Sequence, residues 1–120
     1  MPTTLREKRQ EYVHLLEISL KRLVAVLKNL DEVERISLFG SYASGRRDLM
    51  TDLDVLVVMR TDELFVDRLR RLYGLLALPV DLDILCYTPK EFSELKSGGW
   101  LKKALEGETL LYEKEPAGRR

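Results

Sequence analysis

The stretch FGSYASGRRDLMTDLDVLVV, residues Phe39–Val58, contains the two features that decide the fold. It begins with a glycine–serine pair, Gly40-Ser41, and ends in an almost continuously apolar run that starts around Asp52 and Asp54. Such a run predicts a strand covered on both faces of its sheet. Charged groups are costly to bury unless they are paired, so the stretch raises the question of what the two carboxylates bind.

The rest of the chain alternates between helical and strand-like patterns. We expect helices at residues 4–30, 61–76, 88–97 and 100–107, and strands at residues 35–39, 53–59, 80–87 and 109–112. The apolar stripe of the first helix predicts docking on a sheet. This order predicts an α+β fold, a small mixed β-sheet packed with helices. We expect one domain over residues 1–115 and a flexible tail at 116–120.

Three local details sharpen these expectations. Thr61 or Asp62 can cap the second helix. Thr88 opens the sequence TPKE, which combines a capping box with a proline at the first helical position. We expect Trp100 to pack under the last helix.

The composition limits the function. The 120 residues contain 20 lysines and arginines and 20 aspartates and glutamates, so the net charge is zero. This balance argues against nucleic acid as a direct partner, although a local basic patch stays open. The single cysteine, Cys86, cannot form an internal disulfide, which favours a reducing cytoplasm. No stretch is apolar enough for a membrane span. A homo-oligomer stays open.

Acidic residues begin two of the predicted strands. Residues two apart in a strand point to the same face, so Asp52 and Asp54 share one face, and so do Asp81 and Asp83. If the strands are neighbours, they lie about 4.8 Å apart, and three or four carboxylates crowd one end of the sheet. Like charges facing each other across strands are destabilising. Either a positive group lies there or the carboxylates lie apart.

Magnesium suits this arrangement, because it prefers oxygen ligands and leaves room for phosphate oxygens. Two such ions about 3.5–4 Å apart form a clamp for displacement at phosphorus. The Gly40-Ser41 pair supports the same chemistry. A strand that ends in Gly-Ser and enters a helical turn presents backbone N–H groups and a hydroxyl to phosphate oxygens. The combination predicts a site for metal ions and a triphosphate.

Each feature alone also has a structural explanation. A Gly-Ser pair after a strand is usually a turn, and Asp-x-Asp at a strand start is often a turn cap. A calcium loop of the EF-hand type is disfavoured, because Asp48, Asp52 and Asp54 lack its ligand spacing, its central glycine and its terminal glutamate. A plain structural domain would leave the clustered acids unexplained.

The combination resembles the signature of the nucleotidyltransferase superfamily that includes DNA polymerase beta, and within it the minimal nucleotidyltransferases (MNT proteins). That signature is Gly-Ser, a ten-residue spacer and Asp-x-Asp. Here Gly40-Ser41, the spacer Tyr42–Thr51 and Asp52-Leu53-Asp54 match without a gap. The later stretches VDLDILCYTPKEF and WLKKALEGETLLYE are similar to the family's third-acid strand and its closing helix and strand. The resemblance covers residues 35–113 and implies a polymerase-beta-like nucleotidyltransferase fold.

The resemblance also implies roles for individual residues. Asp52 and Asp54 would bind two Mg²⁺ ions, and Ser41 with the Gly40 backbone would hold the β- and γ-phosphates of a nucleoside triphosphate, with ATP expected as the substrate. A hydroxyl would attack the α-phosphate, and pyrophosphate would leave.

The third acid of the family is Asp81 or Asp83 in this chain. Asp83 lies five residues before Thr88 of the Thr-Pro pair, the offset expected in close relatives, so we favour it as the third catalytic acid. Asp81 also follows a valine, as in some relatives, and stays a second candidate metal ligand. Both point to the same face, so the sequence leaves the two open.

The turn departs from the family at one position. Many MNT-type antitoxins have an arginine where this chain has Ser44, and here Arg46 and Arg47 follow Gly45 instead. These two arginines could reach a triphosphate or form a solvated charge pair. The difference bears on the efficiency of transfer and not on the fold.

The acceptor is not visible in the sequence. Relatives that modify antibiotics or tRNA carry an acceptor-binding domain that we do not find here, so we expect another protein to supply the acceptor. The resemblance to MNT proteins suggests a HEPN-domain toxin, neutralised by binding or by transfer of AMP to a tyrosine. The alternative is a non-catalytic nucleotide-binding or HEPN-binding antitoxin module.

Overall fold

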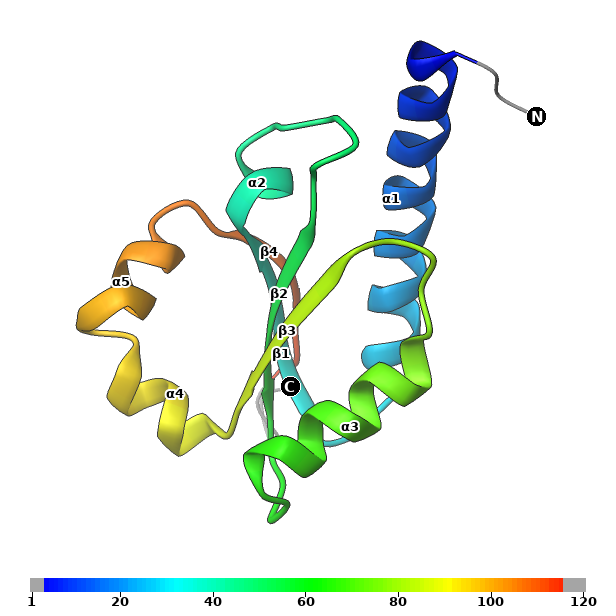
Figure 1. Ribbon diagram of the computed structural model, residues 1–120. Coiled ribbons are helices and arrows are strands. Elements are labelled where there is room, and N and C mark those ends of the chain that lie inside the picture. Colours follow the sequence, from blue (N-terminus) through cyan, green and yellow to red (C-terminus); the bar gives the residue numbers. More distant parts are fainter. Residues whose placement is uncertain (1–3, 116–120) are drawn as a thin grey trace.

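The computed structural model describes residues 4–115, and the predicted tail at 116–120 lies outside the described residues (Figure 1). Five helices and four strands follow one another along this part of the chain. In order they are α1 (Leu5–Leu27), β1 (Val33–Phe39), α2 (Gly40–Ala43), β2 (Leu53–Met59), α3 (Phe65–Leu76), β3 (Leu82–Tyr87), α4 (Pro89–Leu95), α5 (Gly99–Leu105) and β4 (Thr109–Glu113). The predicted α+β class is confirmed.

The strands form one mixed four-stranded sheet in the order β3-β2-β1-β4. β1 is antiparallel to both β2 and β4, whereas β2 and β3 run parallel. The two acid-bearing strands are therefore neighbours, as the site hypothesis requires, and Asp54 lies directly opposite Asp83 in the register. Phe39, the last residue of β1, lies opposite Asp54 on the other side. The beginnings of β2 and β3 thus meet the end of β1 at one end of the sheet.

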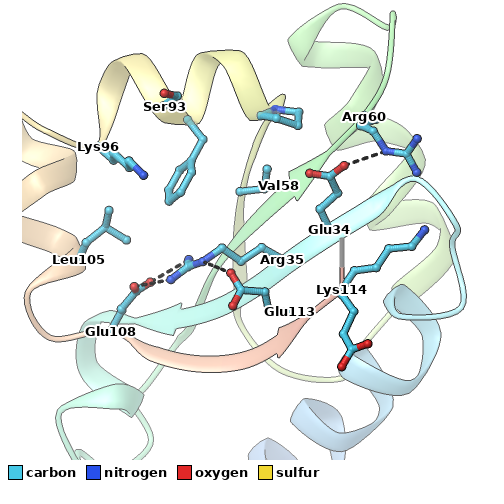
Figure 2. Close-up of a pocket in the computed structure, with 13 residues that line it drawn as sticks. Glu34, Arg35, Val58, Arg60, Ser93, Lys96, Leu105, Glu108, Glu113 and Lys114 are labelled. Atoms are coloured by element: carbon cyan, nitrogen blue, oxygen red, sulfur yellow. Dashed lines mark hydrogen bonds and ion pairs between the residues drawn. The ribbon is translucent and has the colours of Figure 1, made fainter. Parts of the chain in front are cut away.

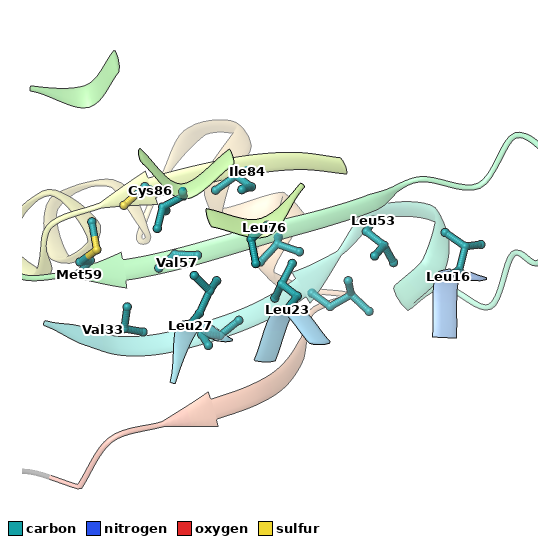
Figure 3. Close-up of a cluster of buried hydrophobic side chains, with 14 residues drawn as sticks. Leu16, Leu23, Leu27, Val33, Leu53, Val57, Met59, Leu76, Ile84 and Cys86 are labelled. Atoms are coloured by element: carbon teal, nitrogen blue, oxygen red, sulfur yellow. The ribbon is translucent and has the colours of Figure 1, made fainter. Parts of the chain in front are cut away.

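Helices cover both faces of this sheet: α1 and α3 lie on one side and α4 and α5 on the other (Figure 1). The hydrophobic core fills the α1/α3 side, where fully buried leucines of both helices meet alternate residues of three strands (Figure 3). Its central members are Leu16, Leu23, Leu27, Leu76, Val57 and Ile84. On β2 the core residues alternate with Asp54, Leu56 and Val58, which therefore point to the α4/α5 side.

Of the two helix caps predicted from the sequence, one is confirmed and one is wrong. The capping box at Thr88 is confirmed, because its side chain accepts from the backbone of Glu91, whose carboxylate accepts from the Thr88 N–H. The predicted cap of α3 is wrong. The helix begins at Phe65 after Leu64, and the Thr61 hydroxyl instead accepts from the backbone N–H of Glu63 at 3.0 Å. A short turn thus replaces the expected first helical turn.

The prediction for Trp100 is also wrong. Trp100 is 58 % exposed, and Leu101 is the residue of α5 that packs inward, with 3 % exposure. Gly98 and Gly99 break the α4–α5 helical stretch, as predicted, and Gly99 has a positive φ of 61°. The side of α5 that carries Leu101, and not the side that carries Trp100, is therefore the buried one.

Among the helices of residues 4–115, none combines the length and the apolar character that a bilayer crossing requires.

Candidate active site

Three carboxylates converge at the end of the sheet where β2 and β3 begin. Asp52, Asp54 and Asp83 each place one oxygen within 4.8 Å of the others. Asp54 and Asp83 owe this to the parallel register of their strands, and Asp52 precedes Asp54 by two residues on the same face. No ion pair joins any of the three to a cation among residues 4–115. The cluster is an uncompensated concentration of negative charge.

Asp54 shows the electrostatic consequence most clearly. Burial, followed by the neighbouring charges of Asp83 and Asp52, raises the pKa of Asp54 to about 6. Asp83 is exposed, while Asp52 and Asp54 are half-buried. A divalent cation would relieve this repulsion. Mg²⁺ binds its oxygens at 2.0–2.1 Å, so ligand oxygens lie up to about 4.2 Å apart across the ion, which is close to the 4.8 Å within which the three carboxylate oxygens lie.

Gly40 lets the carboxylate of Asp54 approach the backbone. A Cβ added at Gly40 would lie 2.2 Å from Oδ2 of Asp54, which is far inside contact distance. Gly40 also has a φ of +74°, a conformation that residues with a side chain rarely adopt. Both facts explain why a glycine stands at the junction of β1 and α2, and they bring the Gly-Ser turn against the acids.

The serines of the turn fix its shape. The Ser41 hydroxyl accepts a hydrogen bond from the backbone N–H of Asp52 at 3.3 Å, so the Gly-Ser pair contacts the Asp-x-Asp segment directly. Ser44 donates its hydroxyl to the Ser41 carbonyl at 3.0 Å. Ser44 therefore stabilises the turn and contributes no positive charge to it.

Arg46 and Arg47 are held by contacts within the same loop. Arg46 pairs with Asp48, with 2.9 Å between Nε and Oδ2. The guanidinium of Arg47 lies 3.4 Å from the centre of the Tyr42 ring and donates to the Tyr42 carbonyl at 2.8 Å. Both side chains are exposed and stand beside the turn, not in the acid cluster.

Asp81 stands apart from the three converging carboxylates. It precedes β3, and its backbone carbonyl accepts from the Leu53 N–H at 2.9 Å. Its carboxylate lies 3.4 Å from the Tyr12 hydroxyl. Asp83, and not Asp81, is the residue that the structure groups with Asp52 and Asp54.

Residues 21–117 match the family described as "Polymerase beta, Nucleotidyltransferase". The chain belongs to this family. The resemblance inferred from the Gly-Ser and Asp-x-Asp motifs is thereby confirmed at the level of the nucleotidyltransferase domain. Among curated proteins, none matches the chain.

Solved structures share the fold of this nucleotidyltransferase domain at low sequence identity. A protein from Sulfolobus solfataricus, provisionally assigned as a nucleotidyltransferase, is 16 % identical with a TM-score of 0.55, over 95 % of this chain and 91 % of that one. A chain of a toxin–antitoxin complex with AMP-PNP is 22 % identical with a TM-score of 0.52, over 82 % and 74 %. A chain of the complex between the tri-AMPylated Shewanella oneidensis HEPN toxin and an MNT antitoxin is 18 % identical with a TM-score of 0.50, over 82 % and 72 %.

The nucleotidyltransferase domain also contains residues near the acids that the sequence did not single out. Tyr12 donates its hydroxyl to the Thr51 carbonyl at 2.9 Å, and Thr51 itself is fully buried. Tyr73 contacts the backbone of β3 on both sides of Asp83. Tyr12 lies four residues before Leu16, so extending the helical period by one turn would have placed it on the buried face.

A cavity of about 1130 Å³ lies on the same sheet face, beside α4 and α5, and extends to the far end of β2; none of the three acids lines it (Figure 2). Val58 lines it, four residues beyond Asp54, which is about 13 Å along an extended strand. Two ion pairs lie among the lining residues, Arg35 with Glu108 and Arg60 with Glu34. Its lining includes Glu34, Arg35, Phe92, Lys96 and Glu108. The cavity and the carboxylate cluster are therefore separate features of the domain.

Proposed function

We propose that this chain is a magnesium-dependent nucleotidyltransferase that moves AMP from ATP to a hydroxyl acceptor. The observation that carries the proposal is the convergence of the Asp52, Asp54 and Asp83 carboxylates beside the Gly40-Ser41 turn, in a chain of the nucleotidyltransferase family. Two Mg²⁺ ions held there supply Lewis-acid stabilisation of charge at phosphorus.

The residues of the chain have distinct tasks in this reaction. The Ser41 hydroxyl accepts from the Asp52 backbone, and its own proton can be donated to a phosphate oxygen. Arg46 and Arg47 stand beside the turn and bind the outer phosphates. Asp83 is exposed, so an acceptor can approach its carboxylate. The acceptor oxygen bonds to the α-phosphorus, the bond to the β-phosphate oxygen breaks, and Asp83 helps to take the hydroxyl proton.

The acceptor that we propose is a tyrosine of a HEPN toxin partner in the cytoplasm, so that the chain acts as an antitoxin. Two considerations support this choice. The motif resembles that of MNT proteins, and chains of toxin–antitoxin complexes share the fold. A non-catalytic antitoxin that binds ATP or the toxin without transfer is the alternative, and the turn without its arginine at Ser44 favours it.

The test is a mass measurement on the partner. The chain is purified together with the protein encoded by the adjacent gene, mixed with Mg-ATP, and the partner is weighed by mass spectrometry. We expect one or more AMP-sized gains with the wild-type chain and none with Asp52→Asn or with EDTA. Asp67→Asn is the matched control, because Asp67 is an acid of α3 that pairs with Arg70 and lies outside the cluster.

The outcomes separate the two candidate functions. ATP binding without any gain in mass supports the non-catalytic module. A gain that Asp52→Asn leaves unchanged contradicts the role of the acid cluster. Absence of ATP binding with and without Mg²⁺ contradicts the transferase function and leaves, of the alternative, only a module that binds the toxin without nucleotide.

A further inference from the structure

The third acid, Asp83, is the most exposed of the cluster and stands on an edge strand, β3. An edge strand has backbone groups on its outer side that no strand satisfies, yet a metal site needs its ligands fixed. We infer that Tyr12 and Tyr73 are positioning residues that hold β3, and with it Asp83, in place beside Asp54. This inference rests on the proposed function, because it assigns the two tyrosines to that metal site.

Tyr12 of α1 joins the starts of the two acid-bearing strands. Its hydroxyl donates to the carbonyl of Thr51 at 2.9 Å and accepts from the backbone N–H of Asp81 at 3.3 Å. Thr51 precedes Asp52 directly, and Asp81 lies two residues before Asp83. One hydroxyl thus links the backbone leading to a ligand on β2 with the backbone leading to a ligand on β3.

Tyr73 of α3 acts on the outer edge of β3. Its hydroxyl accepts from the N–H of Ile84 at 2.8 Å and donates to the carbonyl of Leu82 at 3.2 Å. These are the two backbone groups that flank Asp83 on the side away from β2. The hydroxyl therefore takes the place that a further strand would occupy, and it does so at the residue that carries the carboxylate.

Neither tyrosine is placed to react with a substrate. Both come from helices on the core side of the sheet, whereas Asp54 and Asp83 point to the α4/α5 side. Their effect on the site passes through the backbone segments that carry the acids: β3 itself for Tyr73, and for Tyr12 the residue before β3 and the Thr51 backbone before β2. A purely structural role would alter stability, whereas a positioning role also alters the affinity of the acids for a metal ion.

The experiment compares Tyr12→Phe, Tyr73→Phe and a control, Tyr112→Phe, in the full chain. Tyr112 lies on the other edge strand, β4, and within residues 4–115 its hydroxyl makes no hydrogen bond. Mn²⁺ binding is followed by electron paramagnetic resonance in the presence of a non-hydrolysable ATP analogue. We expect each of the first two variants to bind Mn²⁺ about tenfold more weakly and the double variant more weakly still. Tyr112→Phe should match the wild type.

Amide hydrogen exchange by NMR gives a readout without metal. Tyr73→Phe should speed exchange of the Ile84 amide, and Tyr12→Phe that of the Asp81 amide, by about tenfold or more, because each amide loses its acceptor. Rates at β4 should stay unchanged in both variants.

The proposal and the function on which it rests fail differently. If Asp83→Asn abolishes Mn²⁺ binding while Tyr12→Phe and Tyr73→Phe bind like Tyr112→Phe, the positioning role is wrong and the metal site stands. If the wild type binds no Mn²⁺, or Asp83→Asn binds it equally well, the proposed function itself is contradicted.

Discussion

Two regions of one sheet face differ in how their carboxylates are paired: the cavity, which extends to the far end of β2 (the cavity end), and the acid cluster at the start of β2 (the acidic end). In the cavity, Glu108 and Glu113 lie within ion-pair distance of Arg35, and Glu34 pairs with Arg60 at 2.8 Å (Figure 2). In the acid cluster, the three aspartates crowd together with no cation from residues 4–115.

The paired carboxylates of the cavity stabilise the fold, whereas the unpaired carboxylates of the cluster do not. Unpaired carboxylates that repel one another lower the stability of the fold, and the cation that we propose at the start of β2 and β3 would supply the missing positive charge.

The most direct test of this comparison is a substitution in the acid cluster. Asp54→Asn should reduce Mg²⁺-dependent transfer by at least about 10³-fold, roughly 4 kcal/mol of transition-state stabilisation. The same change should stabilise the metal-free chain at pH 7 by about 1 kcal/mol, because it removes a half-buried charge beside two others. Transfer assays and urea unfolding in EDTA measure the two effects. A variant that loses both activity and stability would contradict the view that the cluster is strained without metal.

Gly40→Ala should cause a large loss of stability, about 2–4 kcal/mol. The positive φ disfavours a side chain, and the new Cβ would collide with the Asp54 carboxylate. Gly74→Ala in α3 is the matched control, since its Cβ would meet no atom within 4 Å. Alanine in a helix interior should raise stability by about 0.5–1 kcal/mol. Equal effects of the two substitutions in urea unfolding would show that the Gly40–Asp54 approach is unimportant.

The sequence predicted the acidic end better than the cavity end, for a physical reason. Strand alternation and the fixed spacing between Gly40 and Asp52 are local properties, so they could be read from the chain. The pairing of Arg35 with Glu108 joins residues 73 positions apart and depends on how α5 returns to β4. No sequence period encodes such a contact.

Long-range contacts also explain the other residues that were missed. Arg68 is 6 % exposed in α3 and bonds to Glu91 of α4 at 2.7 Å, which only the packed structure reveals. Asp81 and Asp83 have the same strand parity, so alternation could not separate them. The register of β3 on β2 does so by placing Asp83 opposite Asp54.

In the cavity, the expected effect of a substitution is a modest loss of stability without a loss of transfer. Glu108→Gln should destabilise the fold by about 1–2 kcal/mol, because it leaves the mostly buried Arg35 guanidinium with a weaker partner. Mg²⁺ affinity and transfer should stay within about twofold of wild type. Thermal unfolding together with the transfer assay tests both statements. Loss of transfer in a stable Glu108→Gln chain would connect the two ends and remove the distinction between them.

The two ends should also respond to pH with opposite signs. The pKa of Asp54 is raised to about 6, so the metal-free fold gains stability as pH falls from 7 through 6 towards the unfolded value near 3.8. Burial alone would raise the pKa of Glu108, but hydrogen bonds from Arg35 lower it below 4.5, so the stability it contributes is present above pH 4.5 and lost in stronger acid.

Urea unfolding in EDTA tests these signs. The stability difference between Asp54→Asn and wild type should shrink by about 1 kcal/mol between pH 7 and pH 5, whereas that of Glu108→Gln should stay constant there and shrink only below about pH 4.5. Saturating Mg²⁺ should remove the Asp54 effect, since the bound ion favours the charged carboxylate. An Asp54 difference that grows towards pH 5 would contradict the raised pKa.

The smallest expected effect lies outside both ends, on α5. Trp100→Ala should change the free energy of unfolding by no more than about 0.5 kcal/mol, because the side chain is 58 % exposed. The neighbouring Leu101→Ala should cost about 2–4 kcal/mol, since Leu101 is 3 % exposed. Urea unfolding of the two variants measures the contrast. A large loss for Trp100→Ala with little for Leu101→Ala would mean that α5 is rotated from the orientation that closes the cavity end of the sheet, and the pairing of Arg35 with Glu108 would then need a different geometry.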